Sequence, residues 1–324
     1  MPRPIAADGA FEAFIRRGHE LIKQGDLREA MAAFKSALAD ARRRLKAESR
    51  PAARVRGRTH PAGPAEEQFN KALASISACH IELGEFEKAS RGLREIILRS
   101  SDDETICAAA YNLSIALRRQ GQFQKAFTYA RKAFEKSKVI GDITWMARCY
   151  NLIGNIHLVQ SHLDKALQHY RKALGLRLKE KTINEYSVAI LRDNIGYCLM
   201  LRGEYDTGID SVRQALDAVT KLGSKKCICE CAHDLSFGLM QLRRLDEAET
   251  YGRMALEIAE AEKYHDIVKN CFYLLGEINY LKGDEKARDH YFYRLQELYP
   301  NLPYLRDFLC TFDVSKIIAL RFPQ

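Results

Sequence analysis

Three cysteines and a histidine stand close together in the segment KKCICECAHD, residues 225–234. Thiolates and imidazoles bind zinc, and neighbouring thiols can carry redox chemistry, so this segment could hold a metal, react or simply pack. Structural zinc uses four converging ligands, often in paired C-x2-C spacings, and the chain contains no C-x-x-C motif. On a helix, Cys227 and Cys231 share a face while Cys229 points elsewhere. We therefore expect these cysteines to pack, and we expect no metal and no other cofactor.

No other pattern in the chain predicts catalysis. A glycine-rich phosphate loop and the G-x-S-x-G and H-E-x-x-H motifs are all missing from the sequence. The histidines are scattered along the chain, and His80 and His157 occupy a position that normally faces a core. A catalytic triad can also assemble from distant segments of a chain, so a prediction about catalysis depends on the architecture as well as on the missing motifs. We predict that the chain is not an enzyme.

The composition indicates a helical protein of the cytoplasm. The 324 residues are 47% hydrophobic with only 8 prolines, and the good helix formers Ala, Leu, Lys, Arg and Glu recur throughout. No apolar run reaches the roughly 18 residues that span a bilayer, and the first residues lack the apolar stretch of a secretory signal. Nine cysteines, an odd number, suggest reduced thiols. We expect a cytoplasmic protein with no membrane contact.

The net charge of +9 is unevenly distributed. Residues 42–66 carry eight Lys or Arg against two Glu, which accounts for most of the excess. Rich in Arg, Pro, Ala and Gly and without hydrophobic periodicity, this segment predicts a disordered insertion. Its basic part, residues 42–58, could bind nucleic acid through counterion release. No aromatic residues stand between the charges to stack on bases, so an insertion without its own ligand is the simpler interpretation.

A short sequence motif recurs seven times along the chain, as in QGDLREA, LGEFEKA and QGQFQKA. Each copy ends in a small residue, at Ala30, Ala89, Ala126, Ala166, Gly208, Ala248 and Ala287. A second small residue precedes these by twelve positions, or by eleven in the last copy, at Gly18, Ser77, Ser114, Gly154, Gly196, Ser236 and Gly276. Flanking residues are apolar at i, i+3, i+4 and i+7, which is typical of amphipathic helices. Since small residues allow two helices to approach closely, each unit predicts a helical hairpin.

These residues resemble the tetratricopeptide repeat (TPR) family, in which a small residue of the first helix, a turn glycine and the alanines of the second helix recur. The best unit is ARCYNLIGNIHLVQSHLDKALQHYRKALGLR, residues 147–177, and the resemblance covers about residues 10–299. The period near 40 residues is similar to the longer repeats of kinesin light chain and LGN-type adaptors rather than to the common form. The resemblance implies an all-α, right-handed superhelical solenoid of about seven antiparallel helix pairs with a concave groove.

The repeats also predict the domain organisation. Residues 1–9 form a tail, residues 10–299 the TPR solenoid with its basic disordered insertion at about 42–66, and residues 300–324 the capping helices. In this last segment apolar residues recur at helical spacing, at Leu302, Leu305, Phe308, Leu309 and Phe312. They can cover the open end of a stack of helix pairs. The same helix could instead bind a partner or form a dimer.

The repeat frame bears on the cysteines as well. When the first small residue of each unit is counted as position 8, Cys149, Cys231 and Cys271 all occupy position 3. Cys107 and Cys229 both occupy position 1. Cysteine therefore recurs at equivalent sites in units that contain no cluster, as a small buried hydrophobic residue does. This register favours packing over metal binding.

In the TPR family, positions 2, 5, 9 and 12 of the first helix generally line the concave groove. The residues that the resemblance places on or beside this groove are Tyr111, Asn112, Arg118, Arg148, Asn151, Asn155, Asp193, Asn194, Tyr197, His233, Phe237 and Tyr273. Asparagine is not favoured inside helices, but its amide can both donate to and accept from a peptide backbone. Tyr and Phe add contact area at low entropic cost. Capping or solvation is the simpler interpretation of the asparagines, and peptide binding is the one we prefer.

We predict a non-catalytic adaptor or scaffold that binds a peptide segment or helix of a partner protein in this groove. Arg118 and Arg148 would make the middle of the groove basic, while Glu230 and Glu277 would make its C-terminal end acidic. Two other classes stay open. One is a peptide- or signal-responsive TPR regulator, although few residues precede the first unit to form an effector module. The other is a nucleic-acid-associated protein that uses residues 42–58.

Overall fold

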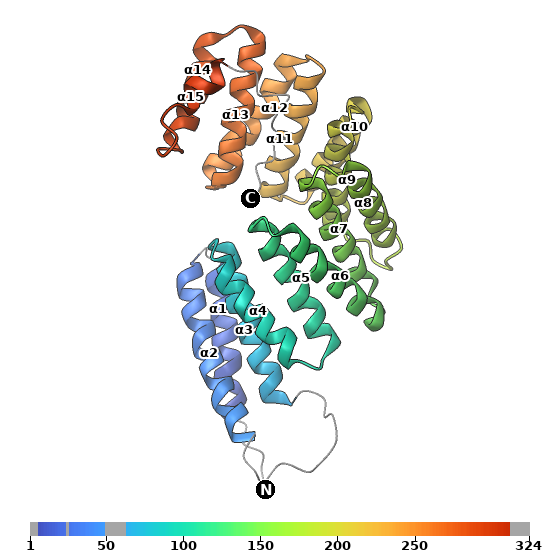
Figure 1. The fold of residues 1–324 in the computed structure, drawn as a ribbon, viewed down its shortest axis with the longest axis vertical. Helices are drawn as coiled ribbons and strands as arrows, with labels where there is room; N and C mark the ends of the chain where they lie inside the picture. Colours follow the sequence, from blue (N-terminus) through green and yellow to red (C-terminus); the bar gives the residue numbers. More distant parts are fainter. Residues whose placement is uncertain (1–5, 24–25, 49–62, 312–324) are drawn as a thin grey trace. The chain divides into compact units, whose positions relative to one another are not determined.

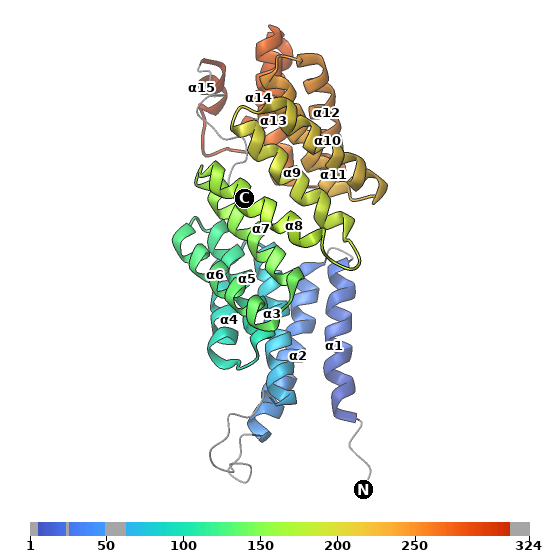
Figure 2. The same cartoon turned by 90° about the vertical axis from the view of Figure 1, so that its right-hand side faces the viewer.

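The computed structural model describes residues 6–23, 26–48 and 63–311. All fifteen elements of regular structure in these residues are α-helices, and successive helices form antiparallel pairs (Figures 1 and 2). The predicted all-α solenoid of helix pairs is confirmed over this part of the chain. The chain divides into two compact units, residues 1–156 and 157–324, and each is described by itself.

Unit 1 contains three complete helix pairs and most of a seventh helix. The helices are α1 (Ala6–Lys23), α2 (Leu27–Glu48), α3 (Pro64–Glu82), α4 (Phe86–Arg99), α5 (Asp103–Arg119), α6 (Phe123–Ile140) and α7 (Ile143–Val159), the last of which ends in unit 2. Its apolar core contains large side chains from several helices, including the fully buried Phe34, Phe69 and Leu113. Burial of such faces, rather than intrinsic helix propensity, supplies most of the stability of each pair.

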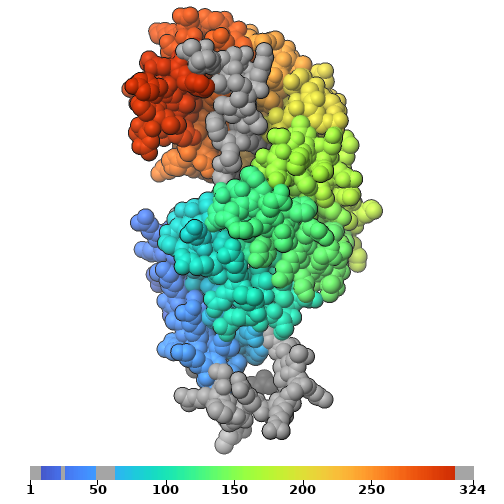
Figure 3. Space-filling model, in the orientation of Figure 1, coloured from blue at the N-terminus to red at the C-terminus, as the bar shows by residue number. Residues whose placement is uncertain are grey.

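Unit 2 contains the remaining helices. They are α8 (Leu163–Arg177), α9 (Glu185–Leu201), α10 (Tyr205–Lys221), α11 (Lys225–Gln241), α12 (Leu245–Ala261), α13 (His265–Lys282), α14 (Glu285–Glu297) and α15 (Leu305–Thr311). One apolar core, which includes Tyr197, Leu235 and Phe292, extends from α9 to α15. In the space-filling view of Figure 3, side chains fill the spaces between neighbouring helices of each unit.

Three predicted boundaries need correction. Helix α1 begins at Ala6, so the predicted tail of residues 1–9 is partly helical. Helix α2 continues to Glu48 and α3 begins at Pro64, so both ends of the predicted insertion at 42–66 are helical, and residues 49–62 lie outside the described residues. Apolar residues of α2 up to Ala41 pack in the same core as α3, and Arg42 and Arg44 continue the contact to Phe69 and Gln68 of α3, so the helix extends beyond what its local composition favours.

The first arginines of the basic segment make internal contacts. The guanidinium of Arg42 lies 5.7 Å from the ring centre of Phe69, and Arg44 forms a 2.7 Å ion pair with Asp40. Arg44 also donates to Gln68 on α3 at 3.2 Å. These contacts hold part of the charge against α3. Binding of nucleic acid by residues 42–58 is tested by none of them and stays a prediction.

The predicted cap at the C-terminal end is described in part. Helix α15 packs against α14, and its Leu309 is buried, as expected for a side chain that covers an open end. Phe308 and Leu302 are about half exposed and contribute less to the cap. Residues 312–324, which include the rest of the predicted capping segment, lie outside the described residues.

The turn inside a helix pair requires a left-handed backbone at position 15 of the repeat, counted with the first small residue as position 8. Glycine takes this conformation at Gly84, Gly121, Gly203 and Gly283. In two other units a residue with a side chain stands there, Ser161 with φ 59° and Arg243 with φ 60°. A left-handed conformation costs a residue other than glycine about 1–2 kcal/mol. The packing of the pair therefore imposes the same turn even where the local sequence opposes it.

The two small residues of each unit lie where the helices of a pair cross. In the pair α9–α10, a Cβ atom added to Gly196 would lie 2.6 Å from the carbonyl oxygen of Gly208, and one added to Gly208 would lie 2.7 Å from that of Gly196. Real Cβ atoms do not approach a backbone this closely, so neither helix has room for even a methyl group. This close contact confirms the predicted role of the repeat in helix packing.

In two of the three units with a serine at the first small position, its hydroxyl joins the two helices by a hydrogen bond, whereas Ser77 donates to Leu73 of its own helix. The Ser114 hydroxyl donates to the carbonyl of Ala126 at 2.7 Å, and the Ser236 hydroxyl donates to that of Ala248 at 2.7 Å. Both pairs are twelve residues apart, in the register that the sequence shows. The buried hydroxyl is satisfied by this carbonyl, so it can be accommodated inside the core.

The residue sixteen positions after the first small residue compensates for its size. Gly18 faces the ring of Phe34, and Gly276 faces the ring of Phe292, at distances of 2.3 and 2.1 Å from an added Cβ. Ser236 instead faces Gly252, whose added Cβ would lie 2.9 Å from the hydroxyl oxygen. A glycine thus accompanies a bulky partner, and a serine accompanies a small one, which keeps the packing dense in each pair.

Gly196→Ala should destabilise the protein by about 1–3 kcal/mol, because its methyl group has no space at the α9–α10 crossing. Gly175→Ala is the matched control, since an added Cβ on this helical residue meets no atom within 4 Å. That variant should stabilise the protein by about 0.4–1 kcal/mol through the unfolded chain. Urea unfolding of both variants measures the two changes. Equal stability of Gly196→Ala and wild type would contradict the close crossing.

Candidate functional site

The three clustered cysteines of α11 are buried separately. Each of Cys227, Cys229 and Cys231 is less than 5% exposed. The thiol of Cys229 donates to the carbonyl of Ala255 at 2.9 Å, and that of Cys227 donates to the Tyr186 hydroxyl at 3.4 Å. Different partners on different helices hold these thiols, which agrees with the predicted packing role.

Cysteine packs in the same way at equivalent positions of the two units. In unit 1 the thiol of Cys107 donates to the carbonyl of Ala133 at 3.3 Å, as Cys229 does to Ala255 in unit 2. Burial raises the pKa of Cys229 to about 12 and that of Cys271 well above its usual value. These thiols are protonated at neutral pH, and a protonated buried thiol is a poor nucleophile.

Among the nine cysteines, Cys310 on α15 is the only one that is not buried, and no disulfide joins any of them. We expect one thiol to react rapidly with a thiol-disulfide reagent in the native protein and the other eight to react only on unfolding. Spectroscopic counting of released thiolate with and without denaturant measures this. Cys310→Ser should remove the fast phase, and two or more fast thiols would contradict the packing of the cluster.

Six of the predicted groove residues lie on the first helices of the pairs in unit 2. They form what we term the inner face of unit 2: Asp193, Asn194, Tyr197, His233, Phe237 and Tyr273. The ring centres of Tyr197 and Phe237 are 5.9 Å apart, which brings α9 and α11 together. All six side chains are 1–7% exposed, so this face is a closed polar and aromatic wall.

His233 lies within this inner face and retains bonding capacity. Its Nδ1 atom lies 3.1 Å from an Asp234 carboxylate oxygen, and both residues are buried. Its Nε2 atom is buried and has no hydrogen-bond partner among the described residues. Next to it, burial first and then the neighbouring Asp193 raise the pKa of Cys231. A buried ring nitrogen without a partner is unusual in a folded protein.

The other six predicted groove residues form the inner face of unit 1. On α5 these are Tyr111, Asn112 and Arg118, and on α7 they are Arg148, Asn151 and Asn155. Arg148 is exposed and the other five are half-buried, so this face is more open to solvent than that of unit 2.

Trp145 organises part of the inner face of unit 1. The ring of Tyr111 meets its edge with centres 5.6 Å apart, and the Arg148 guanidinium lies 4.9 Å from its ring. The groove positions did not include Trp145, which precedes them by about one helical turn. Of the two glutamates expected at the C-terminal end of the groove, Glu277 on α13 is buried and Glu230 on α11 is half-buried, and the acidic character of this end stays a prediction.

Three histidines gather where α8 begins. The ring centres of His157 and His169 are 5.4 Å apart and stacked, and His162 lies 5.8 Å from His157. Burial, followed by the neighbouring His157 and Lys172, lowers the pKa of His169 to about 4. Burial also lowers the pKa of His157. The predicted packing role of His157 fits this partly buried stack of neutral rings.

The low pKa of His169 predicts a loss of stability in mild acid. Because the folded pKa of about 4 lies below the unfolded value of about 6.5, the unfolded state takes up the proton first. The contribution of His169 is complete above about pH 6.5 and is lost as the pH falls toward 4. We expect the unfolding free energy to decrease from pH 7.5 to 5.0 less steeply in His169→Gln than in wild type. Parallel pH profiles of the two proteins in urea would contradict this role.

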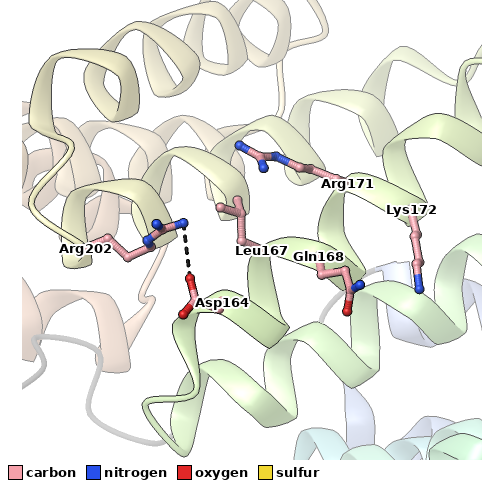
Figure 4. A pocket seen from close by; sticks show the side chains of 6 residues that line it. All are labelled: Asp164, Leu167, Gln168, Arg171, Lys172 and Arg202. Carbon is pink, nitrogen blue, oxygen red and sulfur yellow. Dashed lines mark ion pairs between the residues drawn. The ribbon is translucent and has the colours of Figure 1, made fainter.

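The described residues of each unit line a cavity. That of unit 2, about 440 Å³, lies over Leu167 on α8, where Asp164 and Arg202 form a 3.4 Å ion pair (Figure 4). In Figure 4 Arg171 and Lys172 point in different directions, so their charges do not converge on one ligand. The cavity of unit 1, about 850 Å³, contains carboxylates from α3 and α5 beside Trp145. No sequence motif indicated either cavity.

Two other kinds of function find no support in the described residues. They contain no group of three or more His, Cys, Asp or Glu side chains arranged to hold a metal ion. None of the helices in the described ranges has the length and apolar content needed to cross a lipid bilayer.

Family models of the tetratricopeptide repeat match residues 11–39, 105–179 and 228–262. No curated protein matches the chain in sequence. None of these matches separates the predicted long-period type of repeat from the common form. The long-period type therefore stays a prediction.

Several solved structures are similar to the chain. The apo form of RapI shares 12% identity at a TM-score of 0.59, covering 90% of this chain and 77% of that one. A Rap protein complexed with competence and sporulation factor shares 14% identity at a TM-score of 0.59, covering 94% of this chain and 96% of that one. Aspartyl phosphate phosphatase F from Bacillus subtilis shares 15% identity at a TM-score of 0.59, covering 99% and 97%. At these identities the similarity shows the fold alone.

Proposed function

Because the chain is a tetratricopeptide-repeat protein, we propose that it is a non-catalytic adaptor that binds a peptide segment of a partner protein on its inner faces. The first helices of successive pairs present side chains in one register, so a ligand meets a preformed surface. Little conformational entropy is then lost by the protein on binding, and a few anchoring contacts suffice for affinity.

The buried polar wall of unit 2 carries the proposal. Its polar residues are unusual for the interior of a helical protein, and burial of such groups is costly unless each finds a partner. The Nε2 atom of His233 has no partner among the described residues, and since Nδ1 donates to Asp234, Nε2 can accept a hydrogen bond from a peptide N–H group. Tyr197 and Phe237 pack against each other in the same wall and hold its helices α9 and α11 together.

The similar structures support a peptide as the ligand. One of them is a Rap protein in complex with competence and sporulation factor, and the likeness extends over 94% of this chain. At 14% identity, the factor bound by that protein does not identify the partner of the present chain.

Asn151→Ala combined with Asn155→Ala should weaken peptide binding about tenfold or more, because two amides that can bond a peptide backbone are lost from one turn of α7. The ligand is a fluorescent peptide selected from a random display library on the wild-type protein, and polarisation titrations measure its Kd. His233→Asn should weaken the same peptide if it reaches the inner face of unit 2.

Gln124→Ala is the matched control, since it removes an exposed amide from α6, the second helix of its pair. It should leave the Kd unchanged, and circular dichroism should show the same helical content in every variant. Wild-type affinity in both the asparagine double variant and His233→Asn would remove the inner faces as the binding site.

A second candidate function is a peptide-responsive regulator. The observation that favours it is the similarity to both an apo Rap structure and a peptide-factor complex. In such a regulator the peptide changes the pitch of the solenoid and thereby a second contact surface. Small-angle scattering with and without the selected peptide separates the two functions, because a simple adaptor keeps its radius of gyration.

A further inference from the structure

We propose that the cavity of unit 1 binds the lysine or arginine side chain of a partner peptide. The proposal goes beyond the inner faces and does not depend on them. The cavity has a volume of about 850 Å³ and lies where the N-terminal turns of α3 and α5 approach Trp145 of α7. We term it the acidic cavity, after the four carboxylates that line it, Glu67, Asp102, Asp103 and Glu104.

Most of the negative charge in the acidic cavity is not neutralised internally. Asp103 forms an ion pair with Lys136. Hydrogen bonds from Thr105 lower the pKa of Asp102, which is therefore ionised at neutral pH. Glu67 and Glu104 have no ion-pair partner among the residues that the structure describes.

Helix capping accounts for the carboxylates but not for the rest of the cavity. Acidic residues in the first turn stabilise a helix, so their positions on α3 and α5 need no ligand. Asn70, however, lines the same cavity, is only 4% exposed, and its side-chain carbonyl oxygen has no hydrogen-bond partner among the described residues. A buried acceptor beside uncompensated carboxylates leaves room for a hydrogen-bond donor supplied by a ligand.

A side chain with donors and no acceptor fits this lining best. Carboxylates and the Asn70 carbonyl oxygen only accept hydrogen bonds, whereas an ammonium or guanidinium group only donates. The indole of Trp145 adds an aromatic surface that attracts cations. Two internal contacts already show this chemistry, since Lys136 reaches Asp103 and Arg148 lies over Trp145 at 4.9 Å.

A metal ion fits less well than an organic cation. The described residues include no group of carboxylates close enough together to hold a metal. Their spacing around a large cavity suits an extended cation with several N–H donors, and the open volume admits the aliphatic stem of such a side chain. We therefore assign the site to a basic residue of a peptide rather than to a divalent cation.

Trp145 is the only tryptophan of the chain and lines the acidic cavity, while Tyr111 and Arg148 of the inner face of unit 1 also contact it. Its fluorescence therefore reports on both places, and the cavity variants described below assign the change to the cavity. The full-length protein is titrated with acetyl-Ala-Arg-Ala-amide at constant ionic strength, because screening weakens exposed charge pairs. We expect a saturable change in Trp145 emission. Acetyl-Ala-Gln-Ala-amide, which lacks the charge, should give no saturable change. Equal responses to both peptides would overturn the proposal.

Glu67→Gln combined with Glu104→Gln should raise the Kd of the arginine peptide about fivefold, the size expected for a partly exposed charge pair. Glu66→Gln combined with Glu87→Gln is the matched control, since it removes the same charge from first turns outside the cavity. Equal losses in the two double variants would reduce the effect to net charge and refute the site.

A third variant should act in the opposite direction. Lys136→Gln releases Asp103 from its internal ion pair and should lower the Kd of the arginine peptide. Spermidine and calcium chloride are titrated in parallel. If either one changes Trp145 emission while the arginine peptide does not, the cavity is a polyamine or metal site and the proposal is wrong. Loss of the peptide response alone leaves the inner-face proposal intact, because that is measured with a different peptide.

Discussion

The close approach of two helix backbones at each crossing is the constraint on which the rest of the structure depends. At Gly196 and Gly208 the two helices leave no space for a methyl group, so the pair can adopt one register and one separation. That register fixes which residues of the first helix face the second and which remain for the inner face. In a solenoid the same register recurs in every repeat, and the positions of the side chains on the inner faces follow from it.

The repeat predicted this part of the structure well, because it depends on local spacing. Two small residues twelve positions apart define a helical hairpin without knowledge of its neighbours, and Ser114 and Ser236 confirm the register with their hydrogen bonds to Ala126 and Ala248. The compensating residue sixteen positions later was missed. Phe34, Phe292 and Gly252 differ too much in type to show a pattern until the structure places each beside its partner.

Exposure was harder to predict than position. The groove residues lie on the first helices as the family register implies, yet those of unit 2 are buried while those of unit 1 are half-buried or exposed. Burial depends on how closely consecutive helix pairs approach. This distance is determined by large side chains from different repeats of unit 2, such as Tyr197 and Phe237. No single repeat contains this information. The boundaries at residues 42–48 were wrong for a related reason, since α2 gains contacts with α3 that its own composition does not reveal.

The acidic cavity could not be predicted from motifs in the sequence. Each of its carboxylates has an ordinary local explanation at a helix N-terminus, and Asn70 and Trp145 stand outside the positions that the family uses for ligands. Only their convergence gives the site its chemistry, because one acceptor-rich lining then surrounds one aromatic ring. The inner face of unit 2 and the acidic cavity thus differ in the exposure of their polar groups. The inner face of unit 2 places polar groups inside a closed aromatic wall, where shape and hydrogen bonding decide what binds. The acidic cavity keeps charge near solvent, where a basic side chain gains affinity and loses it again as salt increases.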